Sequence, residues 1–363
     1  MSRERMNVYI TTSKKHLAYA YVAIYSLFEN NRDSEVYLYM VSEDLQERDL
    51  VHELELARSF GHHIIIIPFD DKMARGYTTS GDEQHWPMAT MSCYWLFHAL
   101  LPDDVDRIMA IESDTVTIGS LYDVYHVDLK DAYMACPGPE HKPQTHIDFV
   151  SELGGECVTF VLSVYDVKKI RQDFLLKDIL ETDAVVRKKA KHSQMEFTFG
   201  ILFKNHIKYI AGKDSCLDEN REYMRTLGWD YIAKTEKVCK LLHFSSYEDY
   251  AKPWNPVELM PGYYYWWKYA VNSPYFRDYM ERQWKIYAER QEERENLKKN
   301  LSYRNILFIA FLLFTFITIV EVIIITHNVW NGLLVLVSSA GALLITVAVR
   351  KFLIVLSKFK FSQ

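Results

Sequence analysis

Short apolar runs alternate with longer amphipathic stretches along the first part of the chain. The short runs predict β-strands, and the stretches between them repeat apolar residues at the helical period. One run, His63–Pro68, has only isoleucine between its ends and predicts a fully buried strand. The alternation predicts a Rossmann-like α/β sheet of parallel strands. The predicted strands are Val8–Thr12, Val36–Met40, His63–Pro68 and Asp106–Ile111, and the predicted helices are Ala18–Glu29, Asp44–Phe60 and Met88–Leu101.

The pattern continues less regularly through the middle of the chain. Two further strands, Ala132–Cys136 and Cys157–Val164, are predicted on either side of a loop at Pro137–Pro143. A helix is predicted over Phe174–Lys191, and a charged helical pattern over Tyr275–Lys299 leads into the most apolar part of the sequence. We place the boundary of the N-terminal domain near residue 290.

Two apolar runs near the end of the chain predict transmembrane helices. Asn305–Thr326 is apolar apart from Glu321 and a few hydroxyl residues, and Leu333–Val349 follows after a short connection. At about 1.5 Å per residue, each run reaches or nearly reaches the thickness of a bilayer core. The predicted organisation is an α/β domain at 1–290, a juxtamembrane helical linker at 291–304, a transmembrane hairpin at 305–349 and a basic tail at 350–363.

The charges around these runs predict the orientation of the hairpin. The connection between the runs has no Lys or Arg, whereas basic residues flank both outer ends. By the positive-inside rule, the N-terminal domain and the C-terminus then lie in the cytoplasm, at the cell membrane, with two spans. The flanking basic residues are Arg294, Lys298, Lys299 and Arg304 before the first run, and Arg350, Lys351, Lys358 and Lys360 after the second.

Composition narrows the class of partner. Residues 305–363 hold four basic residues and one Glu, a formal charge of +3. Because the whole chain carries −6, residues 1–304 carry a formal charge of −9. An acidic domain argues against nucleic acid as a partner, and the basic tail suits a bilayer with anionic headgroups. The 5 cysteines lack metal-finger spacing and the N-terminus lacks an apolar signal segment, which fits a reduced, cytosolic domain.

The triplet Glu112-Ser113-Asp114 carries the first candidate chemistry. It follows a predicted buried strand, and side chains two apart on a strand point the same way. Two carboxylates at the carboxyl end of a strand suit Mg²⁺ or Mn²⁺ and, through the metal, a diphosphate. A solvated turn or a helix cap would have the same triplet, so the residues alone leave both readings open.

The triplet belongs to a series of motifs that resembles glycosyltransferase family 8. The series comprises Tyr9–Ser13, Ala23–Asn31, Leu100–Pro102, Glu112–Asp114 with Gly119–Leu121, His243 and Lys252–Trp254, and the resemblance runs over roughly residues 6–280. The resemblance implies a GT-A fold and a retaining, metal-dependent transfer from a nucleotide sugar. It also implies that Glu112, Asp114 and His243 bind Mn²⁺ or Mg²⁺ and that Lys252 contacts the diphosphate.

Other family positions differ in this chain. The first metal-binding acid is Glu112, where relatives have Asp. Thr11, Ser13 and His16 occupy the place of the nucleobase contacts, but without the acid that relatives carry there. Tyr94 or Trp95 stands where relatives often have an arginine, and we interpret Tyr94, with Thr11, Ser13 and His16, as substrate-binding. Gln194 and Glu196 align with an altered catalytic motif and are the predicted catalytic pair, although helix-surface positions would explain them equally well.

The resemblance and the apolar runs together predict a membrane-anchored hexosyltransferase of bacterial cell-surface polysaccharide synthesis. Its donor would be a nucleotide diphosphosugar, with UDP the expected nucleotide, and its acceptor a membrane-associated glycan or a lipid-linked intermediate. The alternative is a membrane-tethered pseudo-glycosyltransferase that binds a nucleotide sugar or a partner enzyme without turnover. The sequence also leaves open whether the chain forms a homo-oligomer or binds a partner glycosyltransferase.

Overall fold

The computed structural model describes residues 3–69, 92–139, 142, 144–190, 195–210, 217–218, 226–244, 252–255 and 259–326. The chain divides into two compact units, Met1–Gln283 and Trp284–Gln363. This division lies inside one helix, α13 (Phe276–Thr326), and precedes the predicted boundary near residue 290. The first turns of α13 therefore belong to the N-terminal unit.

A seven-stranded mixed sheet forms the centre of the N-terminal unit. In spatial order the strands are β3 (His63–Pro68), β2 (Ser34–Ser42), β1 (Glu4–Thr11), β4 (Arg107–Ala110), β7 (Ser163–Asp166), β6 (Met134–Pro137) and β8 (Ile207–Ile210). Strand β1 is parallel to β2 and β4, and β2 is parallel to β3, as the alternating pattern predicts. Strand β7 is antiparallel to both β4 and β6, so the prediction of an entirely parallel sheet is wrong at this strand.

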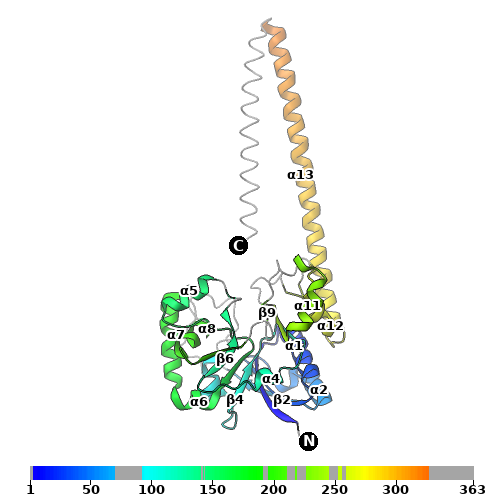
Figure 1. The fold of residues 1–363 in the computed structure, drawn as a ribbon. Helices are drawn as coiled ribbons and strands as arrows, with labels where there is room; N and C mark the ends of the chain where they lie inside the picture. The colour runs from blue at the N-terminus through cyan, green and yellow to red at the C-terminus, as the bar shows by residue number, and fades with distance from the viewer. Residues whose placement is uncertain are drawn as a thin grey trace. The chain divides into compact units, whose positions relative to one another are not determined.

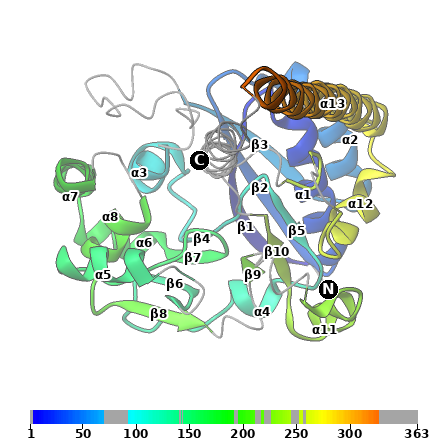
Figure 2. The ribbon, with the colours of Figure 1, turned by 90° about the horizontal axis from the view of Figure 1, so that it is seen from above.

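Helices gather at the two ends of this sheet. Figures 1 and 2 show α1 (Leu17–Asn30), α2 (Val51–Phe60) and α12 (Tyr263–Ala270) together near β1 and β2. At the other end, near β6 and β8, lie α5 (Gln144–Glu152), α6 (Val167–Asp173), α7 (Leu176–Ala190) and α8 (Met195–Leu202). Other short helical elements in the described part of the chain include α3 (Cys93–Trp95), the π-helical turn Leu96–Leu100, α4 (Tyr122–Tyr125) and α11 (Asp230–Val238).

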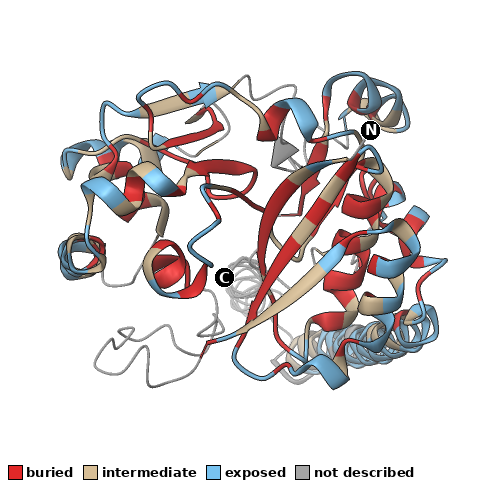
Figure 3. Ribbon diagram, turned by 90° about the horizontal axis from the view of Figure 1, so that it is seen from below, coloured by how far each residue is buried: buried red, intermediate tan, exposed pale blue. Residues whose placement is uncertain are grey.

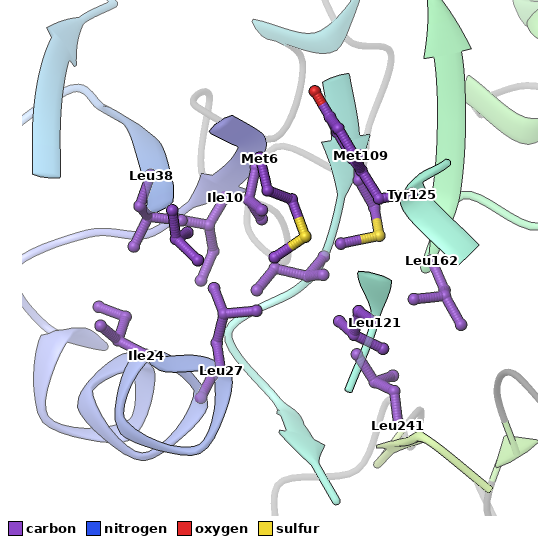
Figure 4. Close-up of a cluster of buried hydrophobic side chains, with 14 of the residues drawn as sticks. Met6, Ile10, Ile24, Leu27, Leu38, Met109, Leu121, Tyr125, Leu162 and Leu241 are labelled. Carbon is purple, nitrogen blue, oxygen red and sulfur yellow. The ribbon is translucent and has the colours of Figure 1, made fainter. Parts of the chain in front are cut away.

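Helix α1 supplies much of the core because it is apolar on nearly every face. It contacts α2, α12 and a strand of a second sheet, so a polar face on it would be buried without partners. Ile24 and Leu27 on this helix lie against Met6, Ile10 and Leu38 of strands β1 and β2 (Figure 4). The strands of the large sheet are mostly buried, whereas the outward faces of the helices are exposed (Figure 3).

The first predicted strands are confirmed as β1, β2, β3 and β4. The expected full burial of His63–Pro68 is wrong, because β3 is the edge strand of the sheet and none of its residues is buried. The helix predicted over Asp44–Phe60 begins only at Val51, after a 3-10 turn at Glu47–Asp49. Of the helix predicted over Met88–Leu101, residues 88–91 lie outside the described part of the chain.

The middle of the chain matches the predictions in part. Ala132–Cys136 corresponds to β6 and Phe174–Lys191 to α7. The strand predicted over Cys157–Val164 is wrong for most of its length, since regular pairing begins only at Ser163. The backbone turns sharply there: Leu162 has a φ of 61°, and its N–H donates to the carbonyl of Ala110 at 2.8 Å.

A second sheet of three strands lies beside the first. It contains β5 (Thr115–Thr117), β10 (Leu241–His243) and β9 (Leu217–Asp218), with β10 antiparallel to β5 and parallel to β9. The backbone N–H of Thr117 donates to Ser26 Oγ on α1 at 3.0 Å, which fixes β5 against that helix. This small sheet joins residues more than a hundred positions apart.

Among the described residues, one helix is long and apolar enough to cross a membrane. This helix, α13, continues without interruption through the predicted linker and the first predicted span, Asn305–Thr326. Its most apolar 18-residue window has a mean hydropathy of 2.8 and is unburied. Length and composition alone support a membrane span here. The second predicted span, 333–349, its connection and the basic tail lie outside the described residues.

Candidate metal centre

The large sheet brings the ends of two strands to one edge. In the parallel pair of β1 and β4, Tyr9 lies opposite Ala110, and the N–H of Ile111 donates to the carbonyl of Tyr9 at 3.0 Å. The segments that follow both strands therefore leave the sheet at the same edge. In open α/β sheets, this carboxyl edge is where ligands bind.

The small sheet then brings His243 to the segment that follows β4. His243 lies opposite Thr115 in the pair of β10 and β5, and the N–H of Phe244 donates to the carbonyl of Asp114 at 3.0 Å. Strand β4 ends at Ala110, so Glu112 and Asp114 lie in a turn and not on a strand. The expectation that strand alternation aligns them is wrong, and the turn brings them together instead.

Glu112, Asp114 and His243 form a compact group of oxygen and nitrogen donors. His243 Nε2 lies 2.9 Å from Glu112 Oε2 and 3.4 Å from Asp114 Oδ1. One ligand atom from each residue lies within 4.8 Å of the others. The side chains are 28%, 19% and 10% exposed, respectively, so the group is reachable from solvent. Two carboxylates and one imidazole are a suitable ligand set for Mn²⁺ or Mg²⁺, and the residues therefore fit a divalent cation.

Lys252 completes this group, which we name the edge cluster (Glu112, Asp114, His243 and Lys252). Its Nζ lies 2.5 Å from Asp114 Oδ2 and 2.5 Å from the carbonyl oxygen of Phe244. Burial would raise the pKa of Asp114, but the charges of Lys252 and His243 outweigh it and hold that pKa well below its ordinary value. Asp114 is therefore ionised. Its Oδ1 faces the imidazole of His243, and its Oδ2 accepts from the ammonium of Lys252.

The predicted nucleotide contacts lie at or just after the end of β1. This strand pairs with β4, whose following turn carries two residues of the edge cluster. Thr11 is the last residue of β1, and Ser13 Oγ lies 3.0 Å from His16 Nδ1 just before α1. Asp44, which follows β2, was missed by the sequence interpretation. Its Oδ1 accepts a 2.8 Å hydrogen bond from the N–H of Lys14. An acid thus reaches this edge from β2, and its place at the start of the helix predicted after that strand was the available signal.

Tyr94 has a different environment from the one expected. Its side chain is fully buried, and its hydroxyl donates to Asp183 Oδ1 at 2.7 Å. Asp183 also accepts from Thr198 Oγ1 at 3.0 Å and pairs with Arg187 Nε at 3.0 Å. We name these four residues the buried cluster. In this structure Tyr94 presents no surface to a substrate, because its ring fills the core between α7 and α8.

Of the predicted catalytic pair, Glu196 is described and Gln194 lies outside the described residues. Glu196 Oε1 lies 3.0 Å from Lys142 Nζ and accepts a 3.1 Å hydrogen bond from the N–H of Phe160. Phe160 lies in the segment that bonds to the end of β4 through Leu162. Two contacts thus fix the carboxylate of Glu196. One of them is to the segment that hydrogen-bonds to the end of β4, the strand that precedes Glu112 and Asp114.

The sheet and the edge cluster define an α/β protein with a candidate divalent-metal site. The family model for glycosyl transferase family 8 matches residues 7–257, and the chain belongs to this family. Its members are retaining glycosyltransferases that transfer a sugar from a nucleotide sugar and typically depend on a divalent metal. Family membership confirms the resemblance that the motifs indicated.

Individual relatives are distant. The lipopolysaccharide 1,2-glucosyltransferase of Escherichia coli is 21% identical over 289 residues, which cover 76% of this chain and 78% of that protein. A crystal structure of the galactosyltransferase LgtC with donor and acceptor sugar analogues has a TM-score of 0.59 at 17% identity, covering 74% of this chain and 96% of LgtC. GlyE of Streptococcus pneumoniae TIGR4 has a TM-score of 0.52 at 17% identity, with 74% and 60% covered. These likenesses establish the GT-A fold.

Proposed function

We propose that the chain is a membrane-anchored, retaining hexosyltransferase that uses a UDP-linked sugar and a divalent cation, Mn²⁺ or Mg²⁺. The observation that carries this proposal is the convergence of ligand atoms from Glu112, Asp114 and His243 within 4.8 Å at the carboxyl edge of the sheet. These residues come from the turn after β4 and from β10, which are more than a hundred positions apart in the sequence, so proximity along the chain does not explain their meeting.

Each part of the site has a chemical task under this proposal. Glu112, Asp114 and His243 hold the cation, which when bound neutralises charge on the departing diphosphate. Lys252 donates hydrogen bonds to a phosphate oxygen, adding a positive charge where negative charge grows. Thr11, Ser13 and His16 contact the nucleoside, with Asp44 as an added candidate. Gln194 and Glu196 line the sugar or acceptor face.

The proposed acceptor is a membrane-associated glycan or a lipid-linked intermediate on the cytoplasmic side. The apolar part of α13 supports this proposal, because a tether raises the concentration of the enzyme at a bilayer without any new contact. The relative from E. coli is named for lipopolysaccharide, a membrane glycan of bacteria. The second span and the basic tail are part of this proposal, with both chain ends in the cytoplasm.

Hydrolysis of a panel of UDP-hexoses by the detergent-solubilised chain, with Mn²⁺, Mg²⁺ or chelator, tests the enzymatic proposal. We expect turnover of one or a few donors that requires metal and that Asp114→Asn abolishes. Asp104→Asn is the matched control, since Asp104 is exposed and pairs with Arg5 at 2.8 Å. Metal-dependent binding of UDP without any turnover would instead support the pseudo-glycosyltransferase.

Transfer to isolated bacterial membranes tests the acceptor proposal. A chain that ends at Lys299 retains the whole N-terminal unit, and we expect it to bind UDP as the full chain does. It should nevertheless glycosylate membranes far more slowly at equal concentration. Equal transfer rates for both chains would mean that the apolar helices serve another purpose, such as assembly with a partner.

A further inference from the structure

The segment Lys252–Asn255 carries Lys252, the proposed diphosphate contact, and is held by hydrogen bonds to its backbone. It closes on itself through the N–H of Asn255, which donates to the carbonyl of Lys252 at 2.9 Å. From α12, Trp267 Nε1 donates to the carbonyl of Pro253 at 3.2 Å. From α13, the side-chain amide of Gln283 donates to the carbonyl of Trp254. Helices α12 and α13, which follow this segment in the sequence, thus fix the backbone that supports Lys252.

Arg282 of α13 makes the polar contact at the far end of this segment. Its Nε donates to Asn255 Oδ1 at 2.5 Å, and Asn255 is 4% exposed. The guanidinium also lies 5.7 Å from the ring centroid of Tyr19, within the range of a cation–π contact. Tyr19 in turn stacks on Trp254, with ring centroids 4.4 Å apart and planes at 10°. Arg282 therefore contacts the segment directly and through an aromatic stack.

We propose that Arg282 is a positioning residue, which places the ammonium of Lys252 in the donor site and thereby sets the affinity of the chain for a diphosphate. The role of Lys252 itself rests on the proposed function above. A lysine has a flexible four-carbon stem and loses rotamer freedom when it binds. A backbone fixed at 252–255 confines that stem to the region of Asp114 and Phe244, so less freedom remains to be lost when a phosphate binds.

Helix α13, the proposed tether, also contributes to the proposed donor site. Its first two turns, Phe276–Gln283, form part of the wall behind that site. Tyr279 adds to this wall, since its ring packs against that of Tyr19 at 6.1 Å and its hydroxyl donates to the carbonyl of Ala18. The helix that is the proposed tether is therefore also a structural part of the catalytic unit.

Calorimetry with UDP and with uridine, in Mn²⁺ and with the full chain in detergent, tests this inference. Arg282→Ala should weaken UDP binding about tenfold, equivalent to ~1.4 kcal/mol, and leave uridine binding unchanged. Arg282→Lys should restore part of the loss, because the ammonium can still donate to Asn255. Arg277→Ala is the matched control, since Arg277 is 87% exposed and pairs along the helix surface with Glu281. Equal loss of UDP and uridine affinity would overturn the inference.

A double-mutant cycle with Lys252→Ala gives the decisive comparison. If Arg282 acts through Lys252, Arg282→Ala has no further effect on UDP affinity once Lys252 is removed. Additive losses would show that Arg282 acts independently and would overturn the proposal.

Acetylation of Lys252 in the free chain, followed by mass spectrometry, needs no nucleotide. We expect Arg282→Ala to speed this acetylation several-fold and Arg277→Ala to leave it unchanged. An unchanged rate in Arg282→Ala would overturn the positioning role. This measurement decides the inference even if the chain binds no UDP and the proposed function fails.

Discussion

The buried cluster and the edge cluster both combine carboxylates with basic groups, but they differ in what surrounds each carboxylate. In the buried cluster, Asp183 is fully buried and faces two hydroxyl donors and the guanidinium of Arg187. One negative charge meets one positive charge. Such a balanced and closed arrangement has no need of a ligand, and it fixes α7 and α8 against Tyr94.

The edge cluster has two carboxylates for one ammonium, together with an imidazole, and its carboxylate side chains are 28% and 19% exposed. In the metal-binding form, in which the imidazole is neutral, negative charge remains in excess. Because unpaired charge is costly at a partly buried position, this excess favours a bound cation. Charge balance and solvent access, and not the presence of acids, therefore separate a packing cluster from a candidate site.

Removing the buried carboxylate should give the largest effect on the fold. Asp183→Ala takes the charge partner from Arg187 and the acceptor from Tyr94, so we expect a loss of ~3–5 kcal/mol in the free energy of unfolding. Chemical denaturation of the solubilised chain measures this loss, with the exposed Asp104→Ala as control. Unchanged stability with lost UDP binding would reverse the roles of the two clusters.

Removing the histidine of the edge cluster should act on binding alone. His243→Ala takes away one of the three proposed metal ligands, so UDP affinity in Mn²⁺ should fall by at least about tenfold. The free energy of unfolding without ligand should stay within ~1 kcal/mol of the wild type. A large drop in stability with normal metal-dependent binding would instead make His243 a packing residue.

Lys252→Met removes the positive charge of the edge cluster and keeps most of the length of the side chain. Lys252 contacts Asp114, so without it Mn²⁺ alone should bind about threefold to tenfold more tightly. UDP should bind more weakly, since a charge is missing at the phosphate. Titrations of Mn²⁺ with and without UDP measure both effects. Weaker binding of Mn²⁺ alone would mean that Lys252 supports the metal ligands instead of competing with the metal.

The smallest expected effect concerns the pH dependence of stability at His62, a buried histidine outside the edge cluster. Burial lowers the pKa of His62 from 6.5 to about 4. Between these values the unfolded chain binds a proton that the folded chain does not, so stability should fall as the pH drops from 6.5 to 4. We expect a loss of roughly 1 kcal/mol after allowing for solvent screening, and none from this position in His62→Gln. Denaturation at several pH values checks the difference, and equal pH profiles for both chains would refute it.

The sequence predicted those parts of the fold and site that depend on local pattern or on motifs. Alternating apolar runs located β1, β2, β3 and β4, and the motif series identified Glu112, Asp114, His243 and Lys252, which the structure brings together. Pattern also indicated α13, since its charged and apolar halves both have helical character.

The rest depends on contacts that no local pattern encodes. Pairing of β5 with β10 joins distant segments of only three residues each, too short for a clear period. Asp183 is one acid among several on a charged helix, and only packing shows that it faces inward. The contact of Arg282 with Asn255 joins a helix to a turn with no shared motif. Tertiary packing, not propensity, decides these positions.

The central claim is that the edge cluster binds a divalent cation together with a nucleoside diphosphate. Calorimetric titration of Mn²⁺ into the full chain at saturating UDP, for the wild type and for Asp114→Asn, tests it most directly. Asparagine keeps the shape of the side chain and removes its charge. We expect the wild type to bind Mn²⁺ at a single site and the variant to show no binding at that site. Equal affinity in both chains would contradict the claim.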